Sequence, residues 1–305
     1  MNHPSVEWPT LIWIVACHAV WALAALAVPD YPWIALPVLV IFTAFHTSLQ
    51  HEVLHGHPTR SGWFNELLVS LPLILVLPYR RYKQLHLKHH NDSNLTDPYE
   101  DPESYFWPEH DVQRMGTIEC AIRGFNNTFL GRMLVGPALT IIGFIRTEWP
   151  RLVTNEKGVR MAWALHILGL VPVVWYLWIV CGVPLWLYFV AVVYPALALI
   201  SVRSFAEHQA AEAVGGRTAI VEAHPFWSWL FLNNNLHIVH HAHPATAWYD
   251  LPELYRERKS QYLAANGGYL FQGYGVIVRR FLLRSKQSLH HPLWYRDQSE
   301  TQDAS

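Results

Sequence analysis

The chain has 305 residues, of which 52% are hydrophobic, 14% aromatic and only 15% charged, whereas charged residues make up about a quarter of an ordinary globular protein. The low charge and the 15 tryptophans predict an all-α integral membrane protein, because Trp and Tyr gather at bilayer interfaces. A formal net charge of −1 gives no basis for nucleic-acid binding, and the three cysteines form neither a CxxC pair nor a disulfide framework.

The first two apolar runs cover about residues 11–28 and 33–50, with a proline-containing turn at 29–32 between them. A helix of about 18 residues is roughly 27 Å long and just crosses a hydrocarbon core of about 30 Å. A cleaved signal sequence is the alternative interpretation of the first run, but the run has no basic start and is longer than a usual signal core. A transmembrane hairpin is therefore expected.

Residues 51–160 are predicted to form part of a helical cap. The run at 66–79 is too short to cross the membrane, and Pro72 and Pro78 favour a re-entrant or interfacial segment. The acidic, proline-rich stretch at 91–111 is predicted to be an ordered loop. Residues 112–155 are amphipathic, and a pair of helices lying on the membrane surface is expected there rather than a crossing.

A second hairpin is predicted from the apolar runs at 161–181 and 185–202, joined by the turn at 182–184. The cap then resumes over 203–265, and 266–305 forms a mixed, soluble-looking tail. A basic patch in the tail is either a solvated helix face or a membrane-surface contact; its residues are Arg279, Arg280, Arg284 and Lys286. Nothing in the sequence divides residues 1–305 into more than one domain.

The distribution of positive charge predicts the topology. The turns at 29–32 and 182–184 contain no Lys or Arg, whereas the other segments between the apolar runs, and the tail, carry several. Loops rich in Lys and Arg stay in the cytoplasm. Both tight turns are therefore expected outside, and both termini and the cap are expected in the cytoplasm.

Histidines form three motifs in the cap. The first is HExxH at 51–55, and HxxHH occurs at 86–90 and again at 237–241. Neutral imidazole is the commonest protein ligand of iron, zinc and copper. Residues i, i+3 and i+4 share one face of a helix, so each HxxHH is expected to aim three imidazoles at one point. The motifs predict a metal site.

Two other functions use some of these features. In a zinc metalloprotease, HExxH supplies two ligands and a general base, but a mononuclear site takes about four ligands and leaves most of the histidines unused. A metal transporter holds its ligands at mid-bilayer, whereas these motifs lie beyond the ends of the apolar runs. Eight or nine nitrogen ligands suit two metal ions better than either alternative.

The order HExxH, HxxHH, hairpin, HxxHH, following a first hairpin, resembles the membrane fatty acid desaturase family, the histidine-box desaturases and hydroxylases. The resemblance covers about residues 10–265. It implies a non-haem di-iron centre that uses O2 and two external electrons to introduce a double bond. It also implies a further ligand after the fourth crossing, where His208 stands. The ligands implied by the resemblance are His51, His55, His86, His89, His90, His208, His237, His240 and His241.

Other histidines, carboxylates and amides lie close to the three motifs in the sequence. His46 and His57 flank the first motif, and His46 is expected to be a core or supporting residue; His243 is not expected to be a ligand. A carboxylate or amide can hold the second nitrogen of a ligand imidazole. The candidates for that supporting role are Glu52, Asp92, Asp97, Glu207 and Asn233 to Asn235, with Asn235 nearest to the third motif. A further acidic set is expected either beside the metals or on a solvated face of the loop; its residues are Glu100, Asp101 and Glu103.

The motifs do not separate desaturation from hydroxylation, ketone formation or alkane-type oxygenation. A desaturase acting on a lipid or an acyl thioester is favoured. No cytochrome b5-like domain or iron–sulfur cysteine set occurs in these residues, so a separate ferredoxin, rubredoxin or cytochrome b5-like protein is expected to supply electrons. The absence of an organelle-targeting segment favours a bacterial inner membrane.

Overall fold

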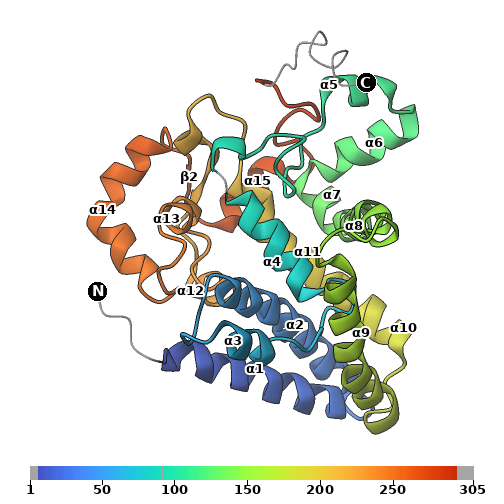
Figure 1. The fold of residues 1–305 in the computed structure, drawn as a ribbon. Coiled ribbons are helices and arrows are strands. Elements are labelled where there is room, and N and C mark those ends of the chain that lie inside the picture. Colours follow the sequence, from blue (N-terminus) through green and yellow to red (C-terminus); the bar gives the residue numbers. More distant parts are fainter. Residues whose placement is uncertain (1–5, 91, 294–305) are drawn as a thin grey trace.

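The computed structural model describes residues 6–90 and 92–293, with the backbone alone for Asp92. The fold is mainly helical, and four of its helical segments are long and apolar enough to cross a membrane. Figure 1 shows the first two of these segments in the lower part of the molecule and the histidine-bearing helices α4, Tyr79–His89, and α13, His237–Ala242, above them. The prediction of an all-α membrane protein with four crossings is confirmed.

The first hairpin consists of α1, Trp8–Ala27, and α2, Pro32–Leu54. Helix α2 continues past the predicted end at residue 50 and therefore includes most of the first histidine motif. No helix breaker occurs in that stretch, and the chain turns only after the C-cap residue His55, where Gly56 adopts φ 109°. A positive φ of this kind is accessible to glycine and strained for other residues.

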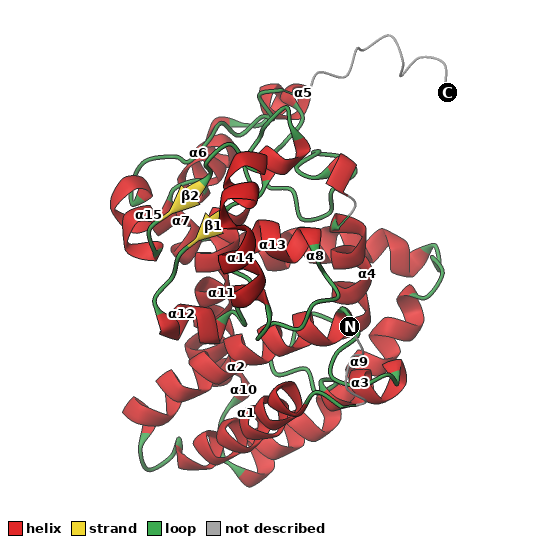
Figure 2. Cartoon of the chain, turned by 90° about the vertical axis from the view of Figure 1, so that its left-hand side faces the viewer, coloured by secondary structure: helices red, strands yellow, loops and turns green. Residues whose placement is uncertain are grey.

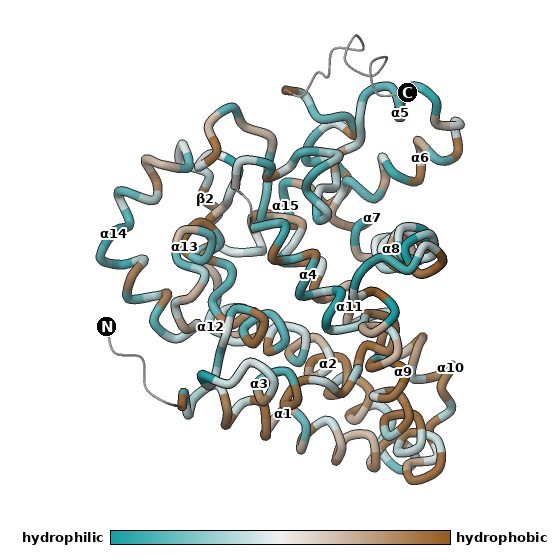
Figure 3. The backbone as a smooth tube through the Cα atoms, viewed as in Figure 1, coloured by the Kyte–Doolittle hydropathy of each residue, from teal (hydrophilic) through white to brown (hydrophobic). Residues whose placement is uncertain are grey.

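The second hairpin begins with α9, Val159–Trp175, which continues as a π-helical turn to Val180. Its return segment joins α10, Leu185–Tyr188, a π-helical turn at Phe189–Val193, and α11, Tyr194–Glu207. The two hairpins meet at the buried Tyr188 hydroxyl, which accepts a hydrogen bond from Trp21 Nε1 at 2.9 Å. In Figure 3 the most hydrophobic stretches lie in α1, α2, α9 and α10.

An irregular segment over residues 69–78 follows α3, Gly62–Leu68, and precedes α4, Tyr79–His89. Its Leu73 side chain is buried between the hairpins. The carbonyls of Leu73 and Leu75 accept hydrogen bonds of 2.8 Å from Tyr188 Oη and His166 Nε2. Non-helical backbone is tolerated at membrane depth where protein groups satisfy it in this way.

The stretch predicted as two surface helices contains four. They are α5, Glu109–Arg114; α6, Thr117–Asn126; α7, Phe129–Leu134; and α8, Gly136–Val153. The predicted number of helices was too low: the chain turns at Gly116, at Asn127 and before Gly136-Pro137, and glycine and Gly-Pro are turn signals. The expected absence of a crossing agrees with the structure, since α8 is not one of the four segments that are both long and apolar enough to cross.

The rest of the cap contains α12, Pro225–Leu230; α13, His237–Ala242; α14, Leu251–Ala265; and α15, Tyr274–Phe281. Short 3-10 helices occur at Asp92–Asn94 and Val214–Arg217. Strand β1, Ile220–Val221, pairs in parallel with β2, Leu270–Phe271 (Figure 2). Residues 266–293, expected as part of a separate tail, therefore contribute a strand and a helix to the cap.

Candidate metal centre

The ends of four helices bring all nine predicted ligands together in two groups. Helix α2 supplies His51 and, at its C-cap, His55; α4 and its C-cap supply the second motif; α11 ends at His208; and α13 carries the third motif. The first histidine group is His51, His55, His86, His90 and His240, and the second histidine group is His89, His208, His237 and His241.

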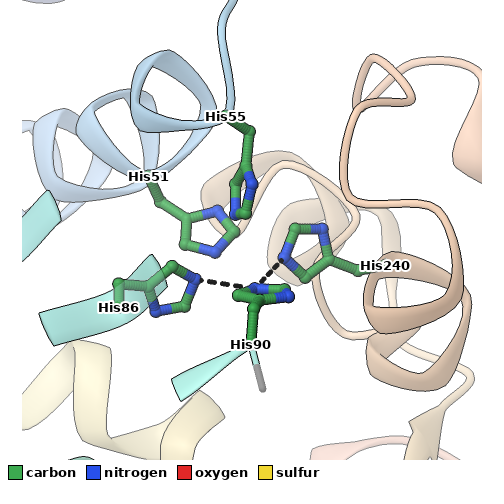
Figure 4. A group of neighbouring side chains, drawn as sticks. All are labelled: His51, His55, His86, His90 and His240. Carbon is green, nitrogen blue, oxygen red and sulfur yellow. Dashed lines mark hydrogen bonds between the residues drawn. The ribbon is translucent and has the colours of Figure 1, made fainter. Parts of the chain in front are cut away.

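Within each group, one nitrogen atom from every histidine lies within 4.8 Å of one nitrogen from each of the others. In the first group, His90 Nε2 is 3.0 Å from His86 Nε2 and 3.1 Å from His240 Nε2. Figure 4 shows these five rings, arriving from different segments, gathered around a common centre. In the second group, His237 Nε2 is 2.9 Å from His208 Nε2.

Each HxxHH motif divides between the two groups, so the expectation that one motif aims three imidazoles at one point is wrong. His86 and His90 join the first group while His89 joins the second; in the third motif, His237 and His241 join the second group and His240 the first. The reason is helical geometry. At about 100° per residue, positions i and i+4 differ by roughly 40°, whereas i+3 lies roughly 60° to the other side.

The two groups adjoin each other. The rings of His90 and His241, one from each group, stack with centroids 4.3 Å apart. His89 and His90 are neighbours in the chain and lie in different groups, with centroids 6.0 Å apart. Two ions held by these groups would therefore be close neighbours, as the prediction of a two-metal site requires.

Carboxylates from the loop after α4 orient two of the histidines. Glu103 Oε1 lies 2.8 Å from His86 Nδ1, and Asp101 Oδ1 lies 2.8 Å from His89 Nδ1. A carboxylate at Nδ1 fixes the proton there, which leaves Nε2 as the ligand atom, and it increases the basicity of the imidazole. Asp101 and Glu103 are thus neighbours of the predicted ligands, and not a solvated loop face alone.

Asn234 and Glu207 support the third motif. Asn234 Oδ1 lies 3.0 Å from His237 Nδ1, and its amide nitrogen lies 3.4 Å from His51 Nε2, so this one side chain touches both groups. Glu207 Oε1 lies 3.4 Å from His237 Nδ1 and 2.7 Å from Arg203 Nε. Asn235, a candidate for the supporting role, instead donates to the Val221 carbonyl at 2.8 Å.

A comparison with protein families identifies the scaffold. The sequence model described as fatty acid desaturase matches residues 31–273. The chain belongs to the fatty acid desaturase family. A comparison with curated proteins finds no match. Membership makes the chain an oxidoreductase of a metal-dependent membrane family.

Electrostatics in this desaturase-family centre keep most of the ligands neutral. Burial, and then the neighbouring histidines, lower the pKa of His55 to about 2. Burial likewise lowers the pKa of five further ligands outside the membrane spans: His86, His90, His208, His237 and His240. Metal coordination requires neutral imidazole, and a buried cluster of this kind provides it.

His89 is the exception. Its burial lowers the pKa, but the carboxylates of Glu103, Asp101 and Glu207 outweigh burial and raise the pKa of His89 to about 9. The same negative charges that favour a proton on this ring also favour a metal cation. The carboxylates that act on His89 therefore favour a cation at the second histidine group.

The residues present fit metal ions. The Nε2 atoms of His55 and His89 are buried without a hydrogen-bond partner among the described residues, and such orphans normally require an explanation. His90 Nε2 lies about 3 Å from the Nε2 atoms of both His86 and His240 and can donate to only one of them, so one of these contacts brings two lone pairs together unless a cation is bound there. All-imidazole donor sets suit iron, zinc and copper ions.

The remaining predicted residues lie elsewhere. Glu52 accepts the Trp248 N–H at 3.0 Å and lies beside His57, outside both histidine groups. Asp97 accepts the N–H groups of Tyr99 and Glu100 and so closes a turn. His46 is buried against His18, and neither His46 nor His243 joins a group. The side chain of Asp92 is outside the described part of the chain.

Proposed function

We propose that this chain is a membrane-bound, O2-dependent di-iron desaturase that introduces a double bond into a fatty acyl chain or a similar substrate. The observation that carries the proposal is the division of nine histidines into two adjoining groups, within a chain of the fatty acid desaturase family. The ligands would be the first histidine group for one ion and the second histidine group for the other.

Two iron ions bound there would supply the chemistry of O2 activation and C–H cleavage. The overall reaction converts –CH2–CH2– and O2, with two electrons and two protons, into –CH=CH– and two molecules of water. The electrons would come from a separate ferredoxin, rubredoxin or cytochrome b5-like protein. A bacterial inner membrane with the centre on its cytoplasmic side is the proposed setting.

This chain's own residues would orient the ligands and exclude water. Glu103 and Asp101 hold the Nδ1 protons of His86 and His89, so the opposite nitrogens face the groups. Before the first motif, Phe45 stacks on Trp229 at 4.6 Å. Apolar walls of this kind protect an oxidising site from side reactions, and positioning of the substrate is the protein's share of the chemistry.

Hydroxylation and ketone formation on the same scaffold remain the alternative, because the histidine groups serve them equally. The deciding experiment supplies the purified protein with an electron donor, an acyl substrate and 18O2, and analyses the products by mass spectrometry. A desaturase yields a product two hydrogens lighter without 18O. A product that carries 18O would identify a hydroxylase or a related oxygenase instead.

Metal content tests the centre itself. The proposal expects about two iron ions per chain in protein purified in detergent. One zinc ion per chain, with no iron, would contradict it and favour the metalloprotease alternative. Transport of the bound metal across vesicles, without turnover of any acyl substrate, would favour the transporter.

A further inference from the structure

A third cluster of titratable side chains lies outside both histidine groups. It consists of Glu7, the residue before α1; Glu52, in the last turn of α2; and His57, in the loop that follows α2. Their exposed fractions are 6%, 6% and 4%. Each offers a potential ligand atom, and these atoms lie within 4.8 Å of one another.

His57 is oriented as metal-binding histidines are. Its Nδ1 lies 2.7 and 2.8 Å from the two carboxylate oxygens of Glu7, which places a proton on Nδ1. Its buried Nε2 has no hydrogen-bond partner among the described residues and faces Glu52 Oε1 at 3.7 Å. A carboxylate on one ring nitrogen, with the other left as a free ligand atom, is the usual arrangement around metal-bound histidine.

The separation between His57 Nε2 and Glu52 Oε1 suits two ligands of one metal ion. At 3.7 Å the contact is too long for a hydrogen bond. Metal–nitrogen and metal–carboxylate bonds are about 2.0 to 2.2 Å long, so two ligands of one ion lie at most roughly 4.2 Å apart. The observed separation is within that limit.

We propose that Glu52 and His57 bind a divalent transition-metal ion of the Zn2+ or Mn2+ class, with Glu7 holding the His57 ring in place. One imidazole with carboxylate oxygens suits these ions better than Ca2+ or Mg2+. The ion is structural. It joins the start of α1 to the end of α2, where His51 and His55 lie, and it is distinct from the two ions of the histidine groups. The site does not depend on the reaction that the enzyme catalyses.

The test compares the metal content of full-length protein and of His57→Gln, each equilibrated with Mn2+, desalted and measured by elemental analysis. The expected result is one transition-metal ion fewer per chain in His57→Gln. His224→Gln, which removes an exposed histidine outside all three clusters, should keep the full content. Equal content in the natural protein and His57→Gln would overturn the proposal.

A second variant covers the case in which His57→Gln does not fold. Glu7→Gln keeps the size of the side chain and an acceptor for Nδ1–H but removes the charge. Loss of a supporting carboxylate typically weakens metal affinity by about 10- to 100-fold. A Mn2+ titration followed by electron paramagnetic resonance should therefore show one class of site weakened to this extent in Glu7→Gln. Unchanged affinity at every site would overturn the proposal.

Discussion

Replacement of Asp101 by asparagine tests whether the loop after α4 supports the second histidine group. Asp101 Oδ1 lies 2.8 Å from His89 Nδ1 and also accepts the Glu103 N–H, while Oδ2 accepts the Thr96 N–H at 2.9 Å. An asparagine can replace only one of these two oxygens, so its NH2 group must face either the Thr96 N–H or the donors at Oδ1. In either orientation the ring of His89 loses its charge partner, and with the NH2 group at the Oδ1 position it also loses the acceptor that orients it.

The expected loss is about 10- to 100-fold in metal affinity, the usual effect of removing a carboxylate that supports a ligand histidine. That range corresponds to about 1.4 to 2.7 kcal/mol. The assay is a competition titration of the purified, metal-depleted protein with Fe2+ against a chelator of known affinity. Only one of the two ions should bind more weakly, because His89 belongs to the second group alone.

Asp97→Asn is the matched control. Asp97 lies in the same loop and also accepts backbone N–H groups, but those of Tyr99 and Glu100. It should bind both ions as tightly as the natural protein. Unchanged affinity in Asp101→Asn would refute the supporting role, and an equal loss in Asp97→Asn would show that any disturbance of the loop has this effect.

Three further predictions concern the ninth ligand, its support and the attachment of α8. His208→Ala should lower the metal content by one ion per chain and abolish turnover. The control, His166→Ala, removes a hydrogen bond to the Leu75 carbonyl and should keep both ions. Activity retained in His208→Ala would show that the site has eight ligands. Lys286→Met should lower the free energy of unfolding in urea by about 1 to 3 kcal/mol, because Lys286 donates hydrogen bonds to the carbonyls of Phe205 and His208. It should also weaken metal binding by the second histidine group, to which His208 belongs. An unchanged urea midpoint would contradict this prediction. Glu148→Ala should lower the free energy of unfolding by about 3 to 5 kcal/mol, because it leaves Arg81 buried without the carboxylate that lies 2.7 Å away. The exposed pair of Arg151 with Glu156 provides the control. Glu156→Ala should change the free energy of unfolding by less than about 1 kcal/mol.

The local features of this protein could be predicted from sequence because each depends on neighbouring residues. Length and hydropathy identify the four crossings. The spacing of imidazoles identifies three histidine motifs, and the family resemblance implies the set of ligands, including His208. Prediction was weaker for helix ends. Helix α2 runs to Leu54 and not to residue 50, because polar histidines at the membrane boundary end the apolar run without ending the helix.

Helical geometry separates the positions within one motif, but tertiary structure decided which histidines of different helices share a group and what supports them. His86 and His89 occur in one motif but serve different groups, and their partners Glu103 and Asp101 lie 17 and 12 residues away in an irregular loop. Glu52, next to His51 in sequence, points instead toward His57. Helical periodicity fixes angles within one helix, but the meeting of side chains from separate helices and loops depends on how the whole chain packs, which no local pattern contains.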